Sequence, residues 1–280
     1  MANRPEPGAR LRSVLICHAE SRLNRDGIAR WLASFSDLVG LVIIEEGTTQ
    51  TRRRIRYEVK RIGLLRFLDV LAFRLYYGLR YAGDDKRWMD GTLDDLARRY
   101  GDLPKSVQVL RTPDPNSSEV ESFLRRLGPD LMVARCKRIL KERIFQVPQH
   151  GTFVLHPGVC PEYRNAHGAF WALARRDLGN VGMTLLRIDR GVDTGPVYGY
   201  FSYDFDEVRE THIVIMTRVV LDNLDAIRDR ILAVCGGQAS PINTRGRHSA
   251  VWGQPWLTSY LRWKREAKRR RDASVVARVP

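Results

Sequence analysis

The segment His156-Pro157-Gly158-Val159-Cys160-Pro161 stands near the middle of this 280-residue chain, and Asp193-Thr194-Gly195-Pro196-Val197 begins 37 residues after the His. Apolar runs precede both segments, at 152–155 and 183–188. Each half is typical of a buried strand that ends in a Gly/Pro-rich loop. In an open α/β sheet, polar residues beyond the carboxyl ends of the strands converge on the ligand crevice. The pattern therefore predicts that His156 and Asp193 meet there as an acid–base pair.

Short apolar runs alternate with amphipathic stretches around these two segments. The apolar runs predict strands over 12–17, 38–44, 107–110, 130–134, 152–155 and 182–188. Helical spacing and a Ser/Asn-rich cap predict helices over 27–35, 119–127, 141–145 and 169–176. This alternation predicts an α/β fold with a mostly parallel sheet and helices on both faces.

Two regions depart from this rhythm. Residues 52–99 contain a dense apolar helical stretch with several Arg, which predicts a helical insertion that packs on the body, on a second copy of the chain or on lipid headgroups. Core or dimer packing is favoured over membrane association. Residues 206–280 begin with a long amphipathic helix over 208–234 and continue as a basic, aromatic tail. We therefore expect one main domain over 10–205 and a short C-terminal extension.

The formal net charge of +15 is the unusual bulk property of the chain. It predicts attraction to an anionic partner, although solvated and partly disordered surface is the favoured interpretation of the basic clusters at 52–61 and 262–271. The N-terminus lacks the apolar centre of a signal peptide, and no apolar run is long enough to span a membrane, which favours a cytoplasmic protein. The four scattered Cys are expected to be reduced, with no metal site.

The stretch from Gly151 to Arg164 and the stretch from Gly182 to Val197 together resemble the folate-dependent formyltransferases. That family includes glycinamide ribonucleotide, methionyl-tRNA and sugar-nucleotide formyltransferases. The resemblance is closest from about Asp130 to Val197, and its most specific part is the second half, GxT(x)6GxDTGPV. It implies a Rossmann-like domain that binds N10-formyltetrahydrofolate and transfers the formyl group to a primary amine.

The resemblance also implies roles for individual residues. His156 matches the family His and would donate to the oxyanion and carry a proton, while Asp193 matches the family Asp and would hold the imidazole charged and help to remove the amine proton. The family loop that surrounds the pterin matches 135–140, which together with Val192 gives six candidate cofactor-binding residues: Arg135, Cys136, Arg138, Ile139, Leu140 and Val192. The cations at Arg135, Lys137 and Arg138 could meet the glutamate tail of the folate.

One family residue is replaced. The family Asn two residues before the His is Val154 here. Loss of one oxyanion donor typically costs about 10²–10³ in rate. Asn165 and His167 lie on the loop that follows His156, and we take them, Asn165 first, as candidates for the missing polarising role. A turn role for Asn165 and an Asx turn at Asp193 are the structural alternatives.

Three classes of function follow. The first is formyl transfer to a small-molecule amine acceptor, most plausibly an amino sugar, because only 85 residues follow Gly195 and a full tRNA-binding barrel is disfavoured. The second is a catalytically altered or inactive formyltransferase-like protein. The third is a basic protein that binds nucleic acid or an anionic membrane. No specific nucleic acid is expected, and a homodimer and a weak association with an anionic membrane surface stay open.

Overall fold

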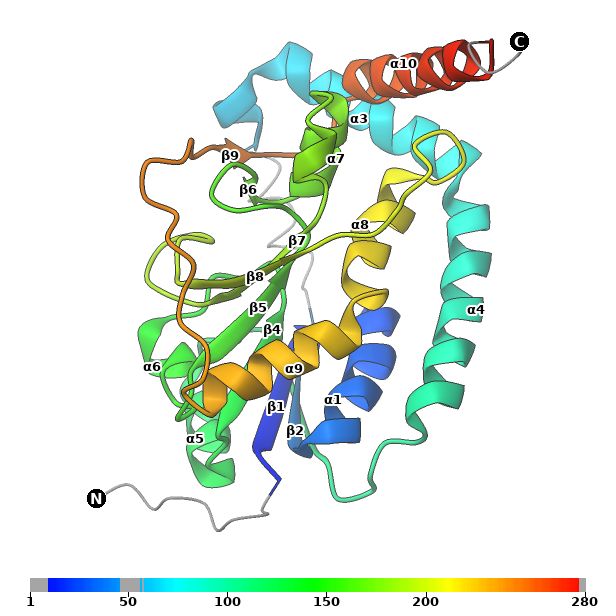
Figure 1. Cartoon of the computed structure of the whole chain (residues 1–280). Coiled ribbons are helices and arrows are strands. Elements are labelled where there is room, and N and C mark those ends of the chain that lie inside the picture. Colours follow the sequence, from blue (N-terminus) through cyan, green and yellow to red (C-terminus); the bar gives the residue numbers. More distant parts are fainter. Residues whose placement is uncertain (1–9, 46–55, 57, 277–280) are drawn as a thin grey trace. The chain divides into compact units, whose positions relative to one another are not determined.

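The computed structural model describes residues 10–45, 56 and 58–276. Its main sheet has seven strands in the order β3-β2-β1-β4-β5-β7-β8 (Figure 1). These strands are β1 (Arg12–His18), β2 (Asp37–Ile44), β3 (Gln108–Thr112), β4 (Leu131–Arg135), β5 (Thr152–His156), β7 (Met183–Arg187) and β8 (Val197–Phe201). The pairs from β3 to β5 are parallel, and β8 is antiparallel to β7. The mostly parallel α/β sheet predicted from the sequence is confirmed.

The helices fill most of the intervals between the strands. They are α1 (Ala29–Phe35), α3 (Leu64–Arg80), α4 (Ala82–Tyr100), α5 (Ser118–Leu127), α6 (Glu142–Phe145), α7 (Gly168–Ala174), α8 (His212–Leu221), α9 (Leu224–Cys235) and α10 (Leu257–Val276). A π-helical turn (Leu23–Ile28) precedes α1, and a 3-10 turn (Leu178–Asn180) follows α7. A second sheet contains β6 (Arg164–Asn165) and β9 (Val251–Trp252).

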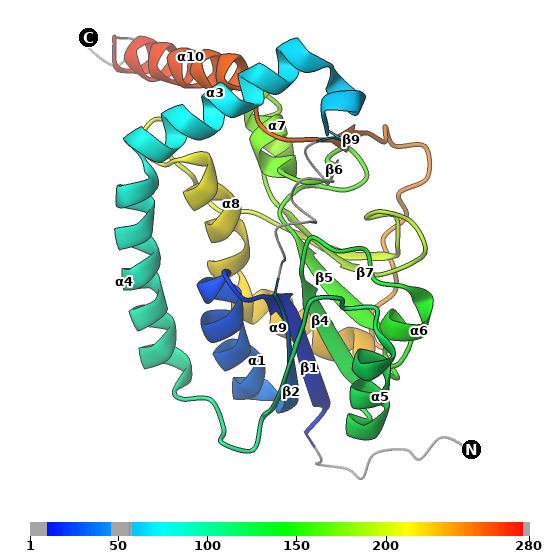
Figure 2. The ribbon, with the colours of Figure 1, turned by 180° about the vertical axis from the view of Figure 1, so that it is seen from behind.

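Contacts divide the chain into two compact units. Unit 1 contains residues 1–46, 90–154 and 187–190, and unit 2 contains 47–89, 155–186 and 191–280. In unit 1, α5 and α6 cover one face of the strands and α1 covers the other, as the rear view shows (Figure 2). The α5 face is a core of buried apolar side chains from the strands and the two helices, among them Val14, Ile16, Val42, Leu124 and Met132. Both faces of this part of the sheet are therefore covered.

Unit 2 is organised around helices and aromatic side chains. Helices α3 and α10 lie side by side in both views (Figures 1 and 2) and pack against each other. Tyr260 and Trp263 of α10 are buried, and the ring of Tyr260 packs 5.4 Å from that of Phe73 on α3. These C-terminal aromatic residues therefore form part of the core of this unit.

Two expectations about helices need correction. The helix predicted over 208–234 is two helices, α8 and α9, because Asn223 interrupts it: its side-chain nitrogen donates to the carbonyls of Val219 and Ser202, at 3.1 and 3.0 Å. The basic segment 262–271 is helical rather than partly disordered, since it lies within α10. The expected insertion holds two long helices, α3 and α4, while 52–55 and 57 lie outside the described residues.

Candidate active site

His156 and Asp193, which the sequence pattern predicts to form a pair, lie next to each other in the structure. His156 is the last residue of β5, and Asp193 follows β7 in the Gly/Pro-rich loop. Nδ1 of His156 lies 3.6 Å from Oδ2 of Asp193, and their side chains are 7% and 16% exposed. This distance exceeds that of an ordinary N–H···O hydrogen bond, so the two groups face each other without being locked together.

The imidazole of His156 is held from its other side. Nε2 lies 2.9 Å from the carbonyl oxygen of Tyr163, so this nitrogen can only act as a donor there. A side chain at Gly158 would place its Cβ 2.8 Å from Nε2 and 2.6 Å from the same carbonyl oxygen. Only glycine therefore fits where the loop folds over the ring, and Nδ1 is the nitrogen that remains for proton transfer.

Asp193 is held by the segment that contains Asn165. The backbone N–H of Asn165 donates to Oδ2 of Asp193 over 2.7 Å. The side-chain nitrogen of Asn165 donates to the carbonyl of Trp252 over 2.6 Å, and β6 pairs with β9 at these same two residues. The Asn165 side chain thus joins the loop to the C-terminal segment, while its backbone contacts the carboxylate.

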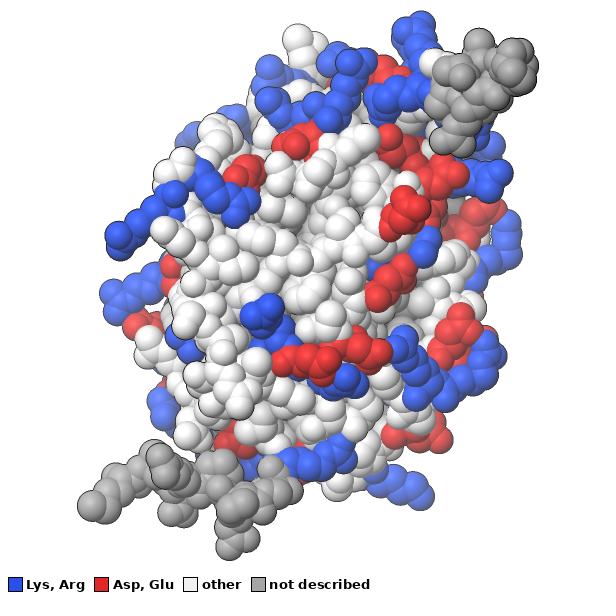
Figure 3. Space-filling view, viewed as in Figure 1, with Lys and Arg blue, Asp and Glu red and all other residues white. Residues whose placement is uncertain are grey.

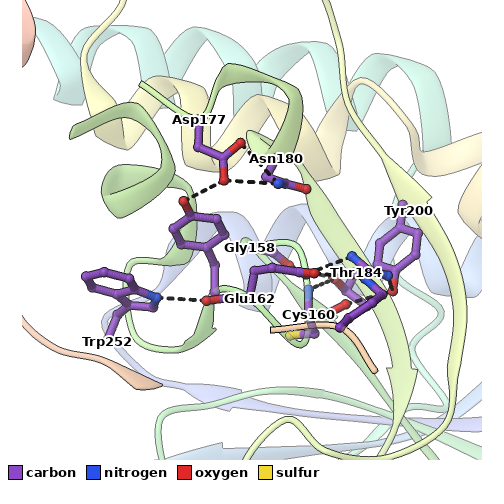
Figure 4. Close-up of polar contacts among 10 residues, drawn as sticks. Gly158, Cys160, Glu162, Asp177, Asn180, Thr184, Tyr200 and Trp252 are labelled. Atoms are coloured by element: carbon purple, nitrogen blue, oxygen red, sulfur yellow. Dashed lines mark hydrogen bonds and ion pairs between the residues drawn. The ribbon is translucent and has the colours of Figure 1, made fainter. Parts of the chain in front are cut away.

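The loop from Gly158 to Glu162 is fixed by buried polar contacts (Figure 4). Oγ1 of Thr184, on β7, accepts from the backbone N–H of Cys160 over 2.9 Å and donates to the carbonyl of Gly158 over 2.6 Å. The Tyr200 hydroxyl donates to the Cys160 carbonyl over 2.7 Å. The indole N–H of Trp252 donates to the Glu162 carbonyl over 2.9 Å. These contacts hold the loop that follows His156 in place.

His167 directly precedes α7, and its own backbone is in the left-handed conformation, with a φ of 62°. Its ring centroid lies 6.3 Å from that of His212, a fully buried residue at the start of α8. Burial is the main cause that lowers the pKa of His212 well below 6.5, and the nearby His167 and Lys264 act in the same direction. His167 thus has a structural place at a helix start, and the sequence does not reveal its neighbour His212.

Val154 occupies the strand position where the resemblance expects Asn. It is partly buried, stands opposite Ala134 in the β4–β5 register and packs against the apolar core beneath α5 and α6. An apolar side chain suits this environment, because an amide there would require a hydrogen-bond partner. Unit 1 therefore accommodates Val154 as a core residue.

The proposed cofactor loop begins at the carboxyl end of β4, beside the end of β1, where the strand order reverses. Nε of the Arg135 guanidinium donates to Oδ1 of Asn24 over 3.0 Å, and burial lowers the Arg135 pKa to about 10. The backbone N–H of Lys137 donates to Nε2 of His18 over 2.9 Å. Sequence reasoning missed His18 and Asn24, although His18 ends a predicted strand in the same way as His156 does.

The other predicted cofactor residues differ in exposure. Ile139 is 70% exposed and Val192 is 37% exposed, whereas Leu140 is buried in the unit 1 core. The Arg138 guanidinium lies 3.7 Å from a carboxylate oxygen of Asp114. Cys136 is partly buried against the same core, and burial raises the pKa of its thiol to about 11. Ile139 and Val192 are therefore the exposed apolar residues of this set, and Arg138 is paired with a carboxylate.

Comparison with known proteins indicates which family the chain resembles. Residues 101–225 match the family model described as formyl transferase. A methionyl-tRNA formyltransferase from a Mycobacterium species (strain KMS) is 30% identical over 141 residues, which cover 50% of this chain and 45% of that protein. One from Dehalococcoides mccartyi (strain CBDB1) is 32% identical over 120 residues, 42% of this chain and 36% of that protein. The chain spans less than half the length of these relatives.

Solved structures share the fold at low sequence identity. Glycinamide ribonucleotide transformylase 1 from Symbiobacterium toebii has a TM-score of 0.52 and 13% identity, covering 86% of this chain and 99% of that chain. A sugar N-formyltransferase from a Shewanella species has a TM-score of 0.51 and 11% identity, covering 87% and 76%. Residues 101–225 are therefore similar to the formyl transferase family, whose members use N10-formyltetrahydrofolate.

Proposed function

We propose that this protein transfers a formyl group from N10-formyltetrahydrofolate to a primary amine, with His156 and Asp193 as its catalytic residues. The observation that carries the proposal is the His156–Asp193 pair, with 3.6 Å between Nδ1 and Oδ2. The bound folate would supply the formyl carbon. The loop after β4 fits such a ligand, because Ile139 presents apolar surface suited to a flat ring and Arg138 could exchange its contact with Asp114 for a carboxylate of the glutamate tail.

The division of labour follows from the hydrogen bonds. His156 keeps its Nε2 proton on the Tyr163 carbonyl, so Nδ1 can donate to an oxygen on which negative charge develops only in the imidazolium form, in which both ring nitrogens carry a proton. Asp193 faces that nitrogen and can accept a proton from the attacking amine. Asn165 acts as a positioning residue, since its backbone N–H fixes the carboxylate while its amide is engaged with Trp252.

We infer a small amine, such as an amino sugar, as the acceptor, because a sugar N-formyltransferase is among the proteins that share this fold. Methionyl-tRNA is the second candidate, since methionyl-tRNA formyltransferases share 30% and 32% identity with this chain over part of its length. The cytoplasmic location stays a prediction.

One assay tests the function and separates the two acceptors. Purified protein is incubated with N10-formyltetrahydrofolate and either amino-sugar nucleotides or methionyl-tRNA, and release of tetrahydrofolate is followed. Turnover with the sugar amines supports the proposal. Turnover with methionyl-tRNA alone would identify methionyl-tRNA as the acceptor in place of an amino sugar. Absence of turnover and of folate binding would show an inactive family member, the alternative that Val154 motivates.

A further inference from the structure

Helix α3 presents an apolar face that no described part of the chain covers. Its exposed leucines are 41–84% accessible and are Leu64, Leu65, Leu68, Leu71, Leu75 and Leu79. At 100° per residue they fall within a sector of about 120° that holds no charged residue. Val70 and Phe73, the buried residues of the helix, lie on the opposite side. The helix therefore has one side in the core of unit 2 and one apolar side in solvent.

Basic side chains are present on α3 itself and are numerous on the helix that packs against it. Helix α3 carries three Arg and one Asp, and the neighbouring α10 carries seven Lys and Arg against one Glu and one Asp. The acidic residues are engaged: Asp69 accepts from Thr258, Glu266 pairs with Arg176, and Asp272 lies 3.8 Å from the Arg271 guanidinium. On α10 the exposed cations include Arg262, Arg265, Lys268 and Arg269. Lys and Arg side chains line the upper edge in Figure 3, where Figure 1 places these two helices.

We propose that the leucine face of α3, together with the cations of α10, binds the surface of an anionic lipid bilayer. The leucines would enter the boundary between headgroups and acyl chains, and the guanidinium and ammonium groups would meet headgroup phosphates. The side of α3 opposite the leucines is buried in unit 2, so only the leucine face can enter the bilayer and the helix would lie along its surface. Among the described residues no helix is long and apolar enough to cross a bilayer.

The charge distribution selects this occupant over the others. A symmetric contact with a second copy would bring the same patch of each chain together, and with it two sets of basic residues that repel each other. A nucleic acid would satisfy the cations, but it would leave the leucines without an apolar partner. An anionic bilayer satisfies both the leucines and the cations. The proposal is independent of formyl transfer, because it needs no ligand in the His156–Asp193 site.

The experiment is cosedimentation of the full chain with vesicles of phosphatidylcholine alone or mixed with phosphatidylglycerol, at low and high salt. We expect binding to the mixed vesicles that weakens with salt. Leu75→Gln/Leu79→Gln should lower the bound-to-free ratio by about tenfold or more, because both side chains lose apolar transfer to the bilayer. Arg265→Gln/Lys268→Gln should lower it by about fivefold for each charge removed at low salt.

Matched variants control for a general loss of apolar or basic surface. Leu232→Gln/Ile242→Gln removes two exposed apolar side chains elsewhere, and Lys105→Gln/Arg230→Gln removes two exposed cations elsewhere. Both should bind as the wild type does, and thermal unfolding checks that every variant is folded. Absence of binding to mixed vesicles overturns the proposal. A dimer, seen by light scattering, that the α3 leucine variant dissociates while its vesicle binding is unchanged would also overturn the proposal. The same holds if the protein binds RNA and no vesicles.

Discussion

Oδ2 of Asp193 accepts a hydrogen bond from the backbone N–H of Asn165 over 2.7 Å and lies 3.6 Å from Nδ1 of His156. Asp193 and Asn165 both adopt positive φ, 51° and 71°, a region that non-glycine residues seldom occupy and that Asn and Asp tolerate best. Such conformations persist where the surroundings enforce them. The carboxylate is thus oriented by the fold itself, before any ligand arrives.

Asp193→Asn should keep the fold and lose turnover. The amide oxygen can still accept from the Asn165 N–H, but it cannot act as a base or balance a charged imidazole. We expect the rate of tetrahydrofolate release to fall by about 10²–10⁴-fold, with an unchanged midpoint of thermal unfolding. Asp189→Asn, four residues earlier, is the matched control and should retain turnover. Near-wild-type activity of Asp193→Asn would remove Asp193 from the mechanism.

Val154→Asn should destabilise the protein without a gain in turnover. Val154 is partly buried and packs against the apolar core of unit 1, so an amide there replaces apolar contacts with a polar group beside apolar side chains. We expect the free energy of unfolding to fall by about 1–3 kcal/mol, measured in urea. Val154→Thr is the near-isosteric comparison. A stable Val154→Asn variant with much higher turnover would instead identify the chain as a degraded formyltransferase.

The local parts of the fold could be predicted from the sequence, because burial leaves a pattern over a few residues. The run ending at His156 reads as a strand for this reason. The contact between Asn165 and Trp252 joins residues 87 positions apart, and no local pattern indicates it. The break at Asn223 depends on one amide that reaches the carbonyls of Val219 and Ser202, whereas the apolar periodicity continues through it.

Thr184→Val should loosen the turn that carries His156. Thr184 is fully buried, and its hydroxyl serves both the Cys160 N–H and the Gly158 carbonyl. Valine has the same shape, so the change removes these hydrogen bonds alone and costs about 1–3 kcal/mol for each backbone group left unsatisfied. Thr184→Ser keeps the hydroxyl and should recover most of the stability in urea unfolding. If the Val and Ser variants were equally stable, the hydroxyl would not hold this loop.

His212→Phe should reduce the acid sensitivity of folding. Burial is the main reason why the pKa of His212 lies well below 6.5 in the folded chain. Below pH 6.5 the unfolded chain therefore binds a proton at this residue that the folded chain does not bind. His212 makes its full contribution to the free energy of unfolding above pH 6.5, and this contribution is lost as the pH falls toward the pKa of His212 in the folded chain. Phe suits the site, where the rings of Phe73 and Tyr77 pack 5.3 and 4.8 Å from the imidazole.

Urea unfolding of the wild type and of His212→Phe between pH 7 and pH 5 measures this contribution. The difference in unfolding free energy between the two proteins should shift in favour of the Phe variant as the pH falls, because only the wild type has to keep a buried imidazole neutral. His248→Phe, at an exposed position, is the control for loss of a histidine. Parallel pH profiles for the wild type and His212→Phe would show that the buried imidazole does not limit stability in acid.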